Sequence, residues 1–443
     1  MKRILLSLGL IASLLLTFAC QTGGGGDKVR IGVFMSLTGD TANFGISSVN
    51  GIKMAADEIN TAGGINGKQI ELLVQDDRSD ASEAATIVTK FVTQDMVHAI
   101  LGEVASSRSI AAAPIAQNAK IPMLTPSSTN PEVTKKGDYI FRSCFIDPVQ
   151  GAAIAQFGAK SLNAKRAALM VARNQDYSTG LEKVINETFK KLGGEIVVTQ
   201  SYQSGDQDFN AQITSIKGAN PDVIFVPGYY GDVGLFAKQA RDKGITVPLV
   251  GGDGWDSPSL YQIGGAALNG CYFSNHYSPD DADPAVQKFV SDYKARYNGT
   301  VPDALAATAY DAARILFDAI KRANSLEGAA IRDALAATKE FPGVTGKVTF
   351  NENRDAVKPI VMIKINEGGK FVVAERVQVE GAALPSTAVT STSPASSASS
   401  PSPAAPASEA SPATKASPAA AATPKTTTSP AAKSAPAATK SPA

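Results

Sequence analysis

Short apolar runs rich in β-branched residues alternate with amphipathic segments along most of the chain. The first series predicts strands at 29–34, 70–74 and 99–101, with helices at 51–59 and 81–93 between them. A strand, a crossover helix and a second strand in this order give parallel pairing with right-handed connections. The sequence therefore predicts a parallel sheet covered by helices on both faces.

A second series repeats the pattern after residue 160. We expect strands at 167–171, 196–198, 223–226 and 247–250. Helices are expected between them at 181–192 and 209–216. The fold class is therefore α/β, and the chain between the two termini is long enough for two lobes, each with its own core.

The two ends of the chain have a different composition. Lys2 and Arg3 precede the apolar run 4–19, which is too short for a membrane span of ~20 residues but matches an export signal peptide, so we assign 1–19 to one. The residues before Cys20 resemble the lipobox of bacterial lipoproteins, which implies that Cys20 is lipidated and that 20–27 is a Gly-rich tether. Residues 381–443, rich in Pro, Ser, Ala and Thr, contain no aromatic residue and predict a disordered tail.

Charge and ligand residues exclude several classes of protein. Without the basic residues at the two ends and Glu409, the formal charge of +1 becomes about −4, which argues against a nucleic-acid partner. Two histidines and three cysteines without metal-ligand spacing argue against a transition-metal site. Neither a metal nor a cofactor is expected.

Candidate binding residues follow the predicted strands, where ligands of open α/β sheets bind. Hydroxyls gather in the first series, at Ser106 and at 127–129, whereas Tyr177, Tyr229 and Asp253 follow strands of the second. Hydroxyls and helix-start N–H groups suit an anion, and a carboxylate suits a cation. A ligand carrying both charges between two lobes is an α-amino acid.

The motifs at these positions resemble one known family. They are, in chain order, Ser36-Leu37-Thr38-Gly39, Gly63-Gly64-Ile65-Asn66-Gly67, Asp76-Asp77, Pro126 to Pro131, and Tyr177-Ser178-Thr179-Gly180. Over residues 28–377 the chain resembles the extracellular Leu/Ile/Val-binding proteins of ATP-driven (ABC) importers, which are type I periplasmic binding proteins.

The resemblance implies two Rossmann-like lobes with parallel sheets, joined by a multi-strand hinge. It places 28–146 with 277–357 in lobe 1, and 147–276 with 358–377 in lobe 2. We expect the ligand to be captured by lobe 1 and enclosed when lobe 2 closes onto it.

The resemblance also implies which residues bind the ligand. Ser106, Ser128 and Thr129 would receive the ligand carboxylate, with a carbonyl from Ser127, while Asp253 would pair with the ammonium. The remaining candidates are aromatic: Tyr177, Tyr229, Phe44, Trp255 and Tyr310, the last two inferred from position alone.

The chain departs from the family at its cysteines. Ala105 stands where one cysteine of the family's first-lobe disulfide is expected, so we expect Cys144 and Cys271 to be reduced and buried. We expect His98 and His276 to be structural, since neither has a nucleophile nearby in the sequence.

The expected function is a non-enzymatic solute-binding protein of an ABC importer, exported to the periplasm or the outer face of the membrane. Its partners would be a branched-chain amino acid, the permease subunits with their ATPases, and the membrane through the lipid on Cys20; we expect a monomer. The alternatives of the same fold are receptors for other neutral or aromatic amino acids, or for an amide or urea. An enzyme is least supported, because no activated nucleophile or acid/base pair is evident.

Overall fold

The computed structural model describes residues 28–377. The predicted signal peptide at 1–19, the tether at 20–27 with Cys20, and the tail at 381–443 lie outside the described residues. Within residues 28–377 no helix is long and apolar enough to cross a bilayer, and no group of His, Cys, Asp and Glu is arranged to hold a metal ion.

The first lobe contains a five-stranded, fully parallel sheet in the order β2-β1-β3-β4-β5. Its strands are β1 (Val29–Met35), β2 (Ile70–Asp76), β3 (Ala99–Leu101), β4 (Met123–Thr125) and β5 (Ile140–Arg142). The parallel order that the sequence predicted is therefore confirmed for this sheet, and its strand ends lie at one edge.

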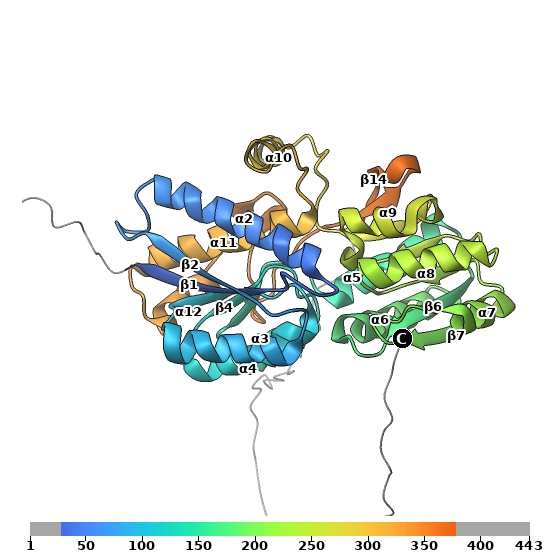
Figure 1. Ribbon diagram of the computed structural model, residues 1–443, viewed down its shortest axis with the longest axis horizontal. Helices are drawn as coiled ribbons and strands as arrows, with labels where there is room; N and C mark the ends of the chain where they lie inside the picture. Colours follow the sequence, from blue (N-terminus) through green and yellow to red (C-terminus); the bar gives the residue numbers. More distant parts are fainter. Residues whose placement is uncertain (1–27, 378–443) are drawn as a thin grey trace, which may run out of the picture. The chain divides into compact units, whose positions relative to one another are not determined.

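Helices cover both faces of this sheet (Figure 1). On one face α2 (Ala42–Thr61) packs against α11 (Ala304–Ala323), and on the other α3 (Ala81–Lys90) packs against α4 (Ser106–Ala119). The α3 helix starts where it does because the Asp80 side chain accepts bonds from the Ser82 and Glu83 amides. The remaining elements of the region are η1 (Phe91–Asp95), η2 (Thr134–Lys136), α10 (Pro284–Arg296), α12 (Gly328–Ala336), β11 (Phe341–Gly343) and β12 (Gly346–Val348).

The second lobe contains a seven-stranded sheet in the order β14-β13-β10-β9-β8-β6-β7. Its strands are β6 (Arg166–Ala172), β7 (Glu195–Tyr202), β8 (Val223–Phe225), β9 (Leu249–Gly251), β10 (Tyr272–Asn275), β13 (Ile360–Ile365) and β14 (Phe371–Val377). The first five are parallel, which confirms the predicted pairing for β6 to β9, whereas β10 had not been predicted. Strand β13 runs antiparallel to both β10 and β14. The short turn at η6 (Glu367–Gly369) joins β13 to β14 and allows only antiparallel pairing.

Helices also cover the second sheet. Here α5 (Asp147–Gln156) packs against α6 (Asp176–Lys191), and α8 (Tyr230–Asp242) packs against α9 (Pro258–Gly264). The α6 helix starts at Asp176, five residues before the predicted start at 181. The prediction missed the first turn because that turn is polar and carries no apolar periodicity. The other elements are η3 (Phe157–Ser161), α7 (Asn210–Ala219), η4 (Asp253–Trp255) and η5 (Gly265–Leu268).

The chain crosses between the sheets three times: between β5 and β6, between β10 and α11, and between β12 and β13. The crossing between β12 and β13 is tied to the first sheet by a β-bridge between Arg142 and Asp355. Cys144 and Cys271 are free and buried, as expected from the sequence.

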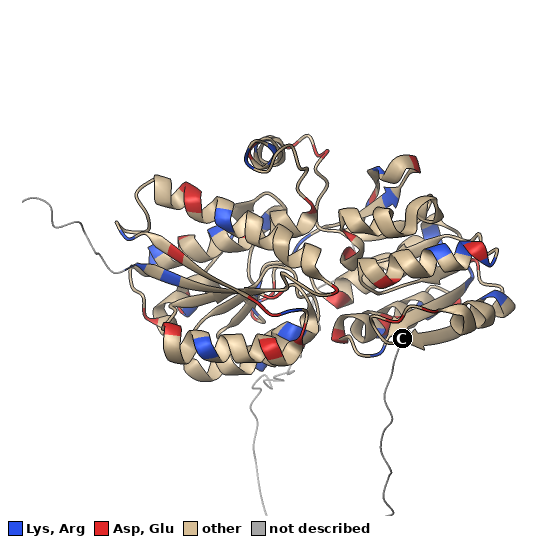
Figure 2. Cartoon of the chain, in the orientation of Figure 1, with Lys and Arg blue, Asp and Glu red and all other residues tan. Residues whose placement is uncertain are grey.

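Figure 2 shows Lys and Arg interspersed with Asp and Glu over the helices and loops of both lobes. The basic side chains visible in this view do not form a continuous face.

Candidate functional site

The carboxyl ends of strands from both sheets meet in one region, and the lobes contact each other there. The Ser107 hydroxyl of the first lobe accepts a 2.9 Å bond from the Asp176 amide of the second. Asn130 Nδ2 donates a 2.7 Å bond to the Asp176 carbonyl. Helices α4 and α6 thus start facing each other, and the expected ligand-binding loops lie beside these contacts.

Two of the first-lobe hydroxyls are available to a ligand. The Ser106 Oγ accepts a 3.2 Å bond from the Asn130 amide, which leaves its own proton free to donate. The Thr129 Oγ1 is buried and has no hydrogen-bond partner. Ser127 Oγ instead lies 2.7 Å from Thr308 Oγ1.

Ser128 directs its polar groups into the protein. Its amide donates to Thr125 Oγ1 at 2.9 Å, and its hydroxyl donates to the Glu103 carbonyl at 2.8 Å. Its carbonyl accepts a 2.6 Å bond from Arg142 Nη1. The residue therefore fixes the loop that carries Thr129.

A buried charge cluster supports the Ser106 end of the site. Glu103 accepts bonds from the Ser36 amide and hydroxyl, both at 3.1 Å, and pairs with Arg108 Nε at 3.0 Å. Burial, with the charge of Glu103, raises the pKa of Asp77 to about 7, and Arg108 opposes the rise. Because Arg108 lies on α4, this cluster holds the start of that helix in place.

In the second lobe, three side chains orient the Asp253 carboxylate. Its Oδ1 accepts bonds from Gln150 Nε2 at 2.6 Å and Tyr177 Oη at 2.9 Å, and its Oδ2 lies 3.0 Å from His276 Nε2. His276 stacks on Phe145 with 3.9 Å between ring centroids. Asp253 is 4% exposed and has no Lys or Arg partner among the described residues.

The backbone beside Asp253 approaches these side chains so closely that a glycine is needed. A Cβ on Gly252 would lie 2.3 Å from Tyr177 Oη and 2.9 Å from Gln150 Oε1. Any larger residue would push Tyr177 and Gln150 away from the carboxylate.

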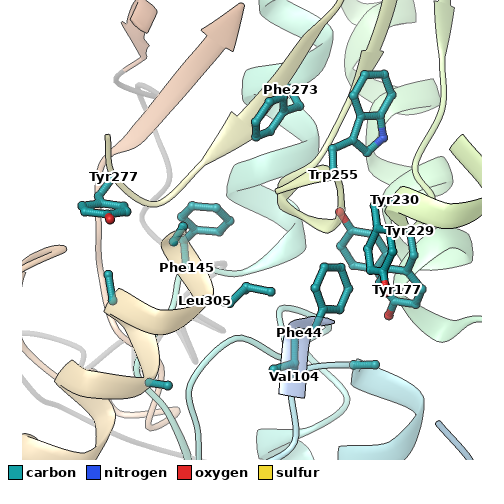
Figure 3. Packing of buried hydrophobic residues seen from close by; sticks show 14 of the residues in the cluster. Phe44, Val104, Phe145, Tyr177, Tyr229, Tyr230, Trp255, Phe273, Tyr277 and Leu305 are labelled. Atoms are coloured by element: carbon teal, nitrogen blue, oxygen red, sulfur yellow. The ribbon is translucent and has the colours of Figure 1, made fainter. Parts of the chain in front are cut away.

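Aromatic rings from both lobes lie close together (Figure 3), and one of them, Tyr177, donates to the Asp253 carboxylate. Tyr177 and Tyr229 stack with their centroids 5.2 Å apart, and the Phe44 ring approaches Tyr229 at 5.6 Å and Tyr230 at 5.0 Å. Burial raises the pKa of Tyr177 and of Tyr229 above its ordinary value, so both remain phenols that can donate hydrogen bonds.

The structure does not bring Trp255 and Tyr310 to this site. The Trp255 ring points away from the tyrosines toward Phe273, and its Nε1 donates a 3.0 Å bond to the Val226 carbonyl (Figure 3). Tyr310 lies between helices and donates to Glu58 Oε2 at 2.8 Å. The sequence shows that Trp255 follows a strand and that Tyr310 lies on a helix. It could not show the direction in which either ring points.

Several buried polar atoms at the site have no hydrogen-bond partner among residues 28–377. They are Thr129 Oγ1, Tyr229 Oη, Gln150 Oε1 and both carboxylate oxygens of Asp147. Burial raises the pKa of Asp147 to about 8, and the nearby Asp253 charge adds to the rise. Buried polar atoms are rarely left unpaired, so this group indicates a bound polar molecule.

Sequence reasoning did not find Gln150, Asp147 and His276. Gln150 and Asp147 lie on the first turns of α5, and His276 directly follows β10. They are remote from Asp253 in the sequence and meet it only in the folded chain. The proximity of His276 to a chain crossing was the one signal available.

The fold and this interlobe site define a two-lobed binding protein. The family model for periplasmic binding proteins matches residues 28–370, and the chain belongs to that family. Such proteins of ABC importers are exported to the periplasm.

Individual relatives are similar over nearly their full length. The chain is 32% identical to the Leu/Ile/Val-binding protein BraC3 of Rhizobium johnstonii, over 78% of this chain and 94% of that protein. It is 41% identical to the leucine-binding protein LivK of Thermotoga maritima, with a TM-score of 0.76 over 79% of this chain and 98% of that one. The branched-chain amino-acid binding protein LivJ of Streptococcus pneumoniae, solved with isoleucine, gives 38% identity and a TM-score of 0.75 over 79% and 99%.

Proposed function

We propose that this protein binds a branched-chain α-amino acid between its lobes and delivers it to an ABC importer. The observation that carries the proposal is the buried Asp253 carboxylate, which is held by three side chains, has no Lys or Arg partner, and lies in the same site as the unpaired Thr129 hydroxyl. An ammonium group would supply the missing positive charge, because a buried carboxylate is stable only when it is paired. The names of the relatives point to the same ligand class.

The two polar ends of the ligand would bind opposite lobes. The ligand carboxylate would accept bonds from the Ser106 and Thr129 hydroxyls, and its ammonium would face Asp253, with Asp147 nearby. Phe44 and Tyr229 would contact its side chain. Ser128 takes a supporting role, because its amide and hydroxyl are already bonded.

Calorimetry on the ligand-stripped protein tests the proposal. We expect leucine, isoleucine and valine to bind most tightly among the twenty amino acids, and urea and short amides not to bind. The keto acid that corresponds to leucine is the control, because it keeps the carboxylate and the side chain but lacks the ammonium. Tight binding of the keto acid, or of an amide in place of any amino acid, would refute the amino-acid assignment.

Closure would make the loaded form recognisable to the importer. We propose that 28–146 with 277–357, and 147–276 with 358–377, move as the two lobes, since each group contains one of the two sheets. A ligand held by both lobes favours the closed form because that form binds it more tightly. The partners would be permease subunits and their ATPases, and the protein would act as a monomer.

We also propose that a lipid on Cys20 anchors the protein at the membrane, on the strength of the sequence before that residue. Replacing it, in Cys20→Ala, should move the exported protein from the membrane fraction to the soluble fraction. Fractionation of cells that express both forms measures this. A variant that stays with the membranes would show that Cys20 is not the anchor.

A further inference from the structure

A second cavity lies behind the loop that carries Asp253. It has a volume of about 360 Å³ and is lined by Asp256, which follows η4, by residues of α9, β10, β13, η6 and β14, and by the segments on either side of α10. Tyr277, one of its walls, lies apart from the Tyr177 and Tyr229 pair, with Phe145 and Leu305 between them in Figure 3. The cavity is therefore separate from the amino-acid site.

The walls of the cavity are mostly apolar and come from both sides of the hinge. The second lobe contributes Tyr261 and Phe371, and the segments that flank α10 contribute Tyr277 and Val301. Val301 is 48% exposed and forms part of the cavity wall. A volume of this size and character suits a small organic molecule.

The charged residues of the cavity are mainly acidic. They are Asp256, Asp280, Asp303 and one exposed lysine, Lys370, which forms no ion pair with them. Asp303 is engaged on both oxygens, by the Ser47 hydroxyl and the Ala306 amide. Burial, with the charge of Asp256, raises the pKa of Asp303 to about 7.

Asp256 has an oxygen that no described residue satisfies. Its Oδ2 accepts bonds from Asn275 Nδ2 at 3.0 Å and the Ala304 amide at 2.7 Å. Its Oδ1 has no donor among the described residues, although the residue is only 4% exposed and lines the cavity. Burial raises the pKa of Asp256, as expected for a carboxyl without a counter-charge.

We propose that this cavity binds a small organic amine whose ammonium group pairs with Asp256 and whose apolar body packs among Tyr261, Tyr277 and Phe371. The ammonium would satisfy the free Oδ1 and offset the acidic charge, and the aromatic rings favour a nearby cation. The cavity has lining residues of its own, so the proposal does not rest on the proposed function.

Titration of phenethylamine into the full-length protein, followed by calorimetry, tests this site. We expect one saturable site in the presence of excess leucine, and a loss of ~tenfold or more in affinity in Asp256→Asn, which keeps the shape and removes the charge. The alcohol 2-phenylethanol has the same size and no charge, so it should bind at least ~tenfold more weakly than the amine.

Asp253→Asn is the matched control, because it removes the carboxylate of the other site. It should bind phenethylamine as the parent does, with or without leucine. If the amine is lost in Asp253→Asn and retained in Asp256→Asn, it binds in the amino-acid site and the proposal is wrong. The absence of saturable binding up to ~10 mM also refutes it.

Val301→Trp provides a second variant that leaves the buried carboxylates intact. Because Val301 is half exposed and lines the cavity, the larger ring should occupy the space with little effect on folding, and amine binding should fall ~tenfold or more. Unchanged amine affinity in this variant would place the amine outside the cavity.

Discussion

The Asp253 carboxylate accounts for most of the ligand specificity that we propose. In Asp253→Asn we expect affinity for leucine to fall ~100-fold to several thousand-fold, because the ligand ammonium loses its buried counter-charge. In Ser106→Ala we expect a loss of ~10-fold to 100-fold, because one hydroxyl donor to the ligand carboxylate is removed. Calorimetric titration of leucine measures both.

The keto acid of leucine provides the control for this comparison. It should bind weakly to the parent and lose little further affinity in Asp253→Asn, because it has no ammonium to lose. Equal leucine affinity in the parent and in Asp253→Asn would show that the charge of Asp253 does not bind the ligand ammonium.

The Asp147 carboxyl should make stability depend on pH. Its folded pKa of about 8 is above the unfolded value of ~3.9, so the folded protein holds a proton that the unfolded chain releases. The free energy of unfolding should therefore fall, by up to ~1.4 kcal/mol per pH unit, as pH rises from ~4 to 8. Above pH 8 this contribution should no longer change.

Asp147→Asn isolates this effect, because the amide cannot ionise. Urea unfolding of the ligand-free parent and variant at pH 5, 6, 7 and 8 gives the difference between them at each pH. Asp77 and Asp303, each with a pKa raised to about 7, act in the same direction in both proteins and cancel in the difference. A difference that is constant with pH would contradict the assignment.

The sequence located the site better than it assigned roles within it. The rule that ligands bind after parallel strands led to Ser106, Thr129, Tyr177 and Asp253, which the structure brings to one region. It could not show that Ser128 turns inward, since that depends on where the fold places two acceptors, the Thr125 hydroxyl and the Glu103 carbonyl. Long-range partners such as His276 were invisible for the same reason.

At the scale of elements, alternation of strands and helices predicted the parallel pairing of most strands in both sheets, but not the order of strands within each sheet. It also left out β5 and β10, and it did not foresee that β13 and β14, which follow the last crossing of the chain, pair antiparallel in the second sheet. An apolar run specifies a strand, but not the sheet it joins or its direction. Those properties depend on the crossing and on the η6 turn.

A buried ion pair ties the last crossing to the first lobe. Arg142 Nε lies 2.5 Å from Asp355 Oδ1, with side-chain exposures of 0% and 6%. In Asp355→Ala the arginine would stay buried without its partner, so we expect a loss of ~3–5 kcal/mol in the free energy of unfolding. Ligand affinity should fall as well, because Arg142 also binds the Ser128 carbonyl.

The matched control is Asp318→Ala, which breaks an exposed pair with Arg322 on α11. It should cost only ~0.3–0.5 kcal/mol, because solvent screens both charges. Denaturant unfolding of the two variants gives the comparison. Equal losses in the free energy of unfolding would show that burial of the Arg142 pair adds nothing to its contribution to stability.

At the scale of the whole molecule, both sheets and the candidate site lie within residues 28–377. We expect removal of residues 381–443 to leave the melting temperature and the leucine affinity unchanged, because that segment has no aromatic residue to bury. Thermal unfolding and calorimetry of the full and shortened chains test this. A marked drop in melting temperature would show that the tail packs on the folded part.

The direct bonds between lobes have a consequence for the energy use of the importer. Asn130 and Ser107 bond Asp176, and Asn43 Nδ2 donates to Ser259 Oγ at 2.6 Å, so these bonds join only groups of the protein itself. Each such bond would contribute ~0.5–1.5 kcal/mol to the closed form whether or not that form is loaded. An empty closed protein would occupy the permease and could trigger ATP hydrolysis without cargo. Adding one more such bond would therefore raise background hydrolysis before it improved uptake.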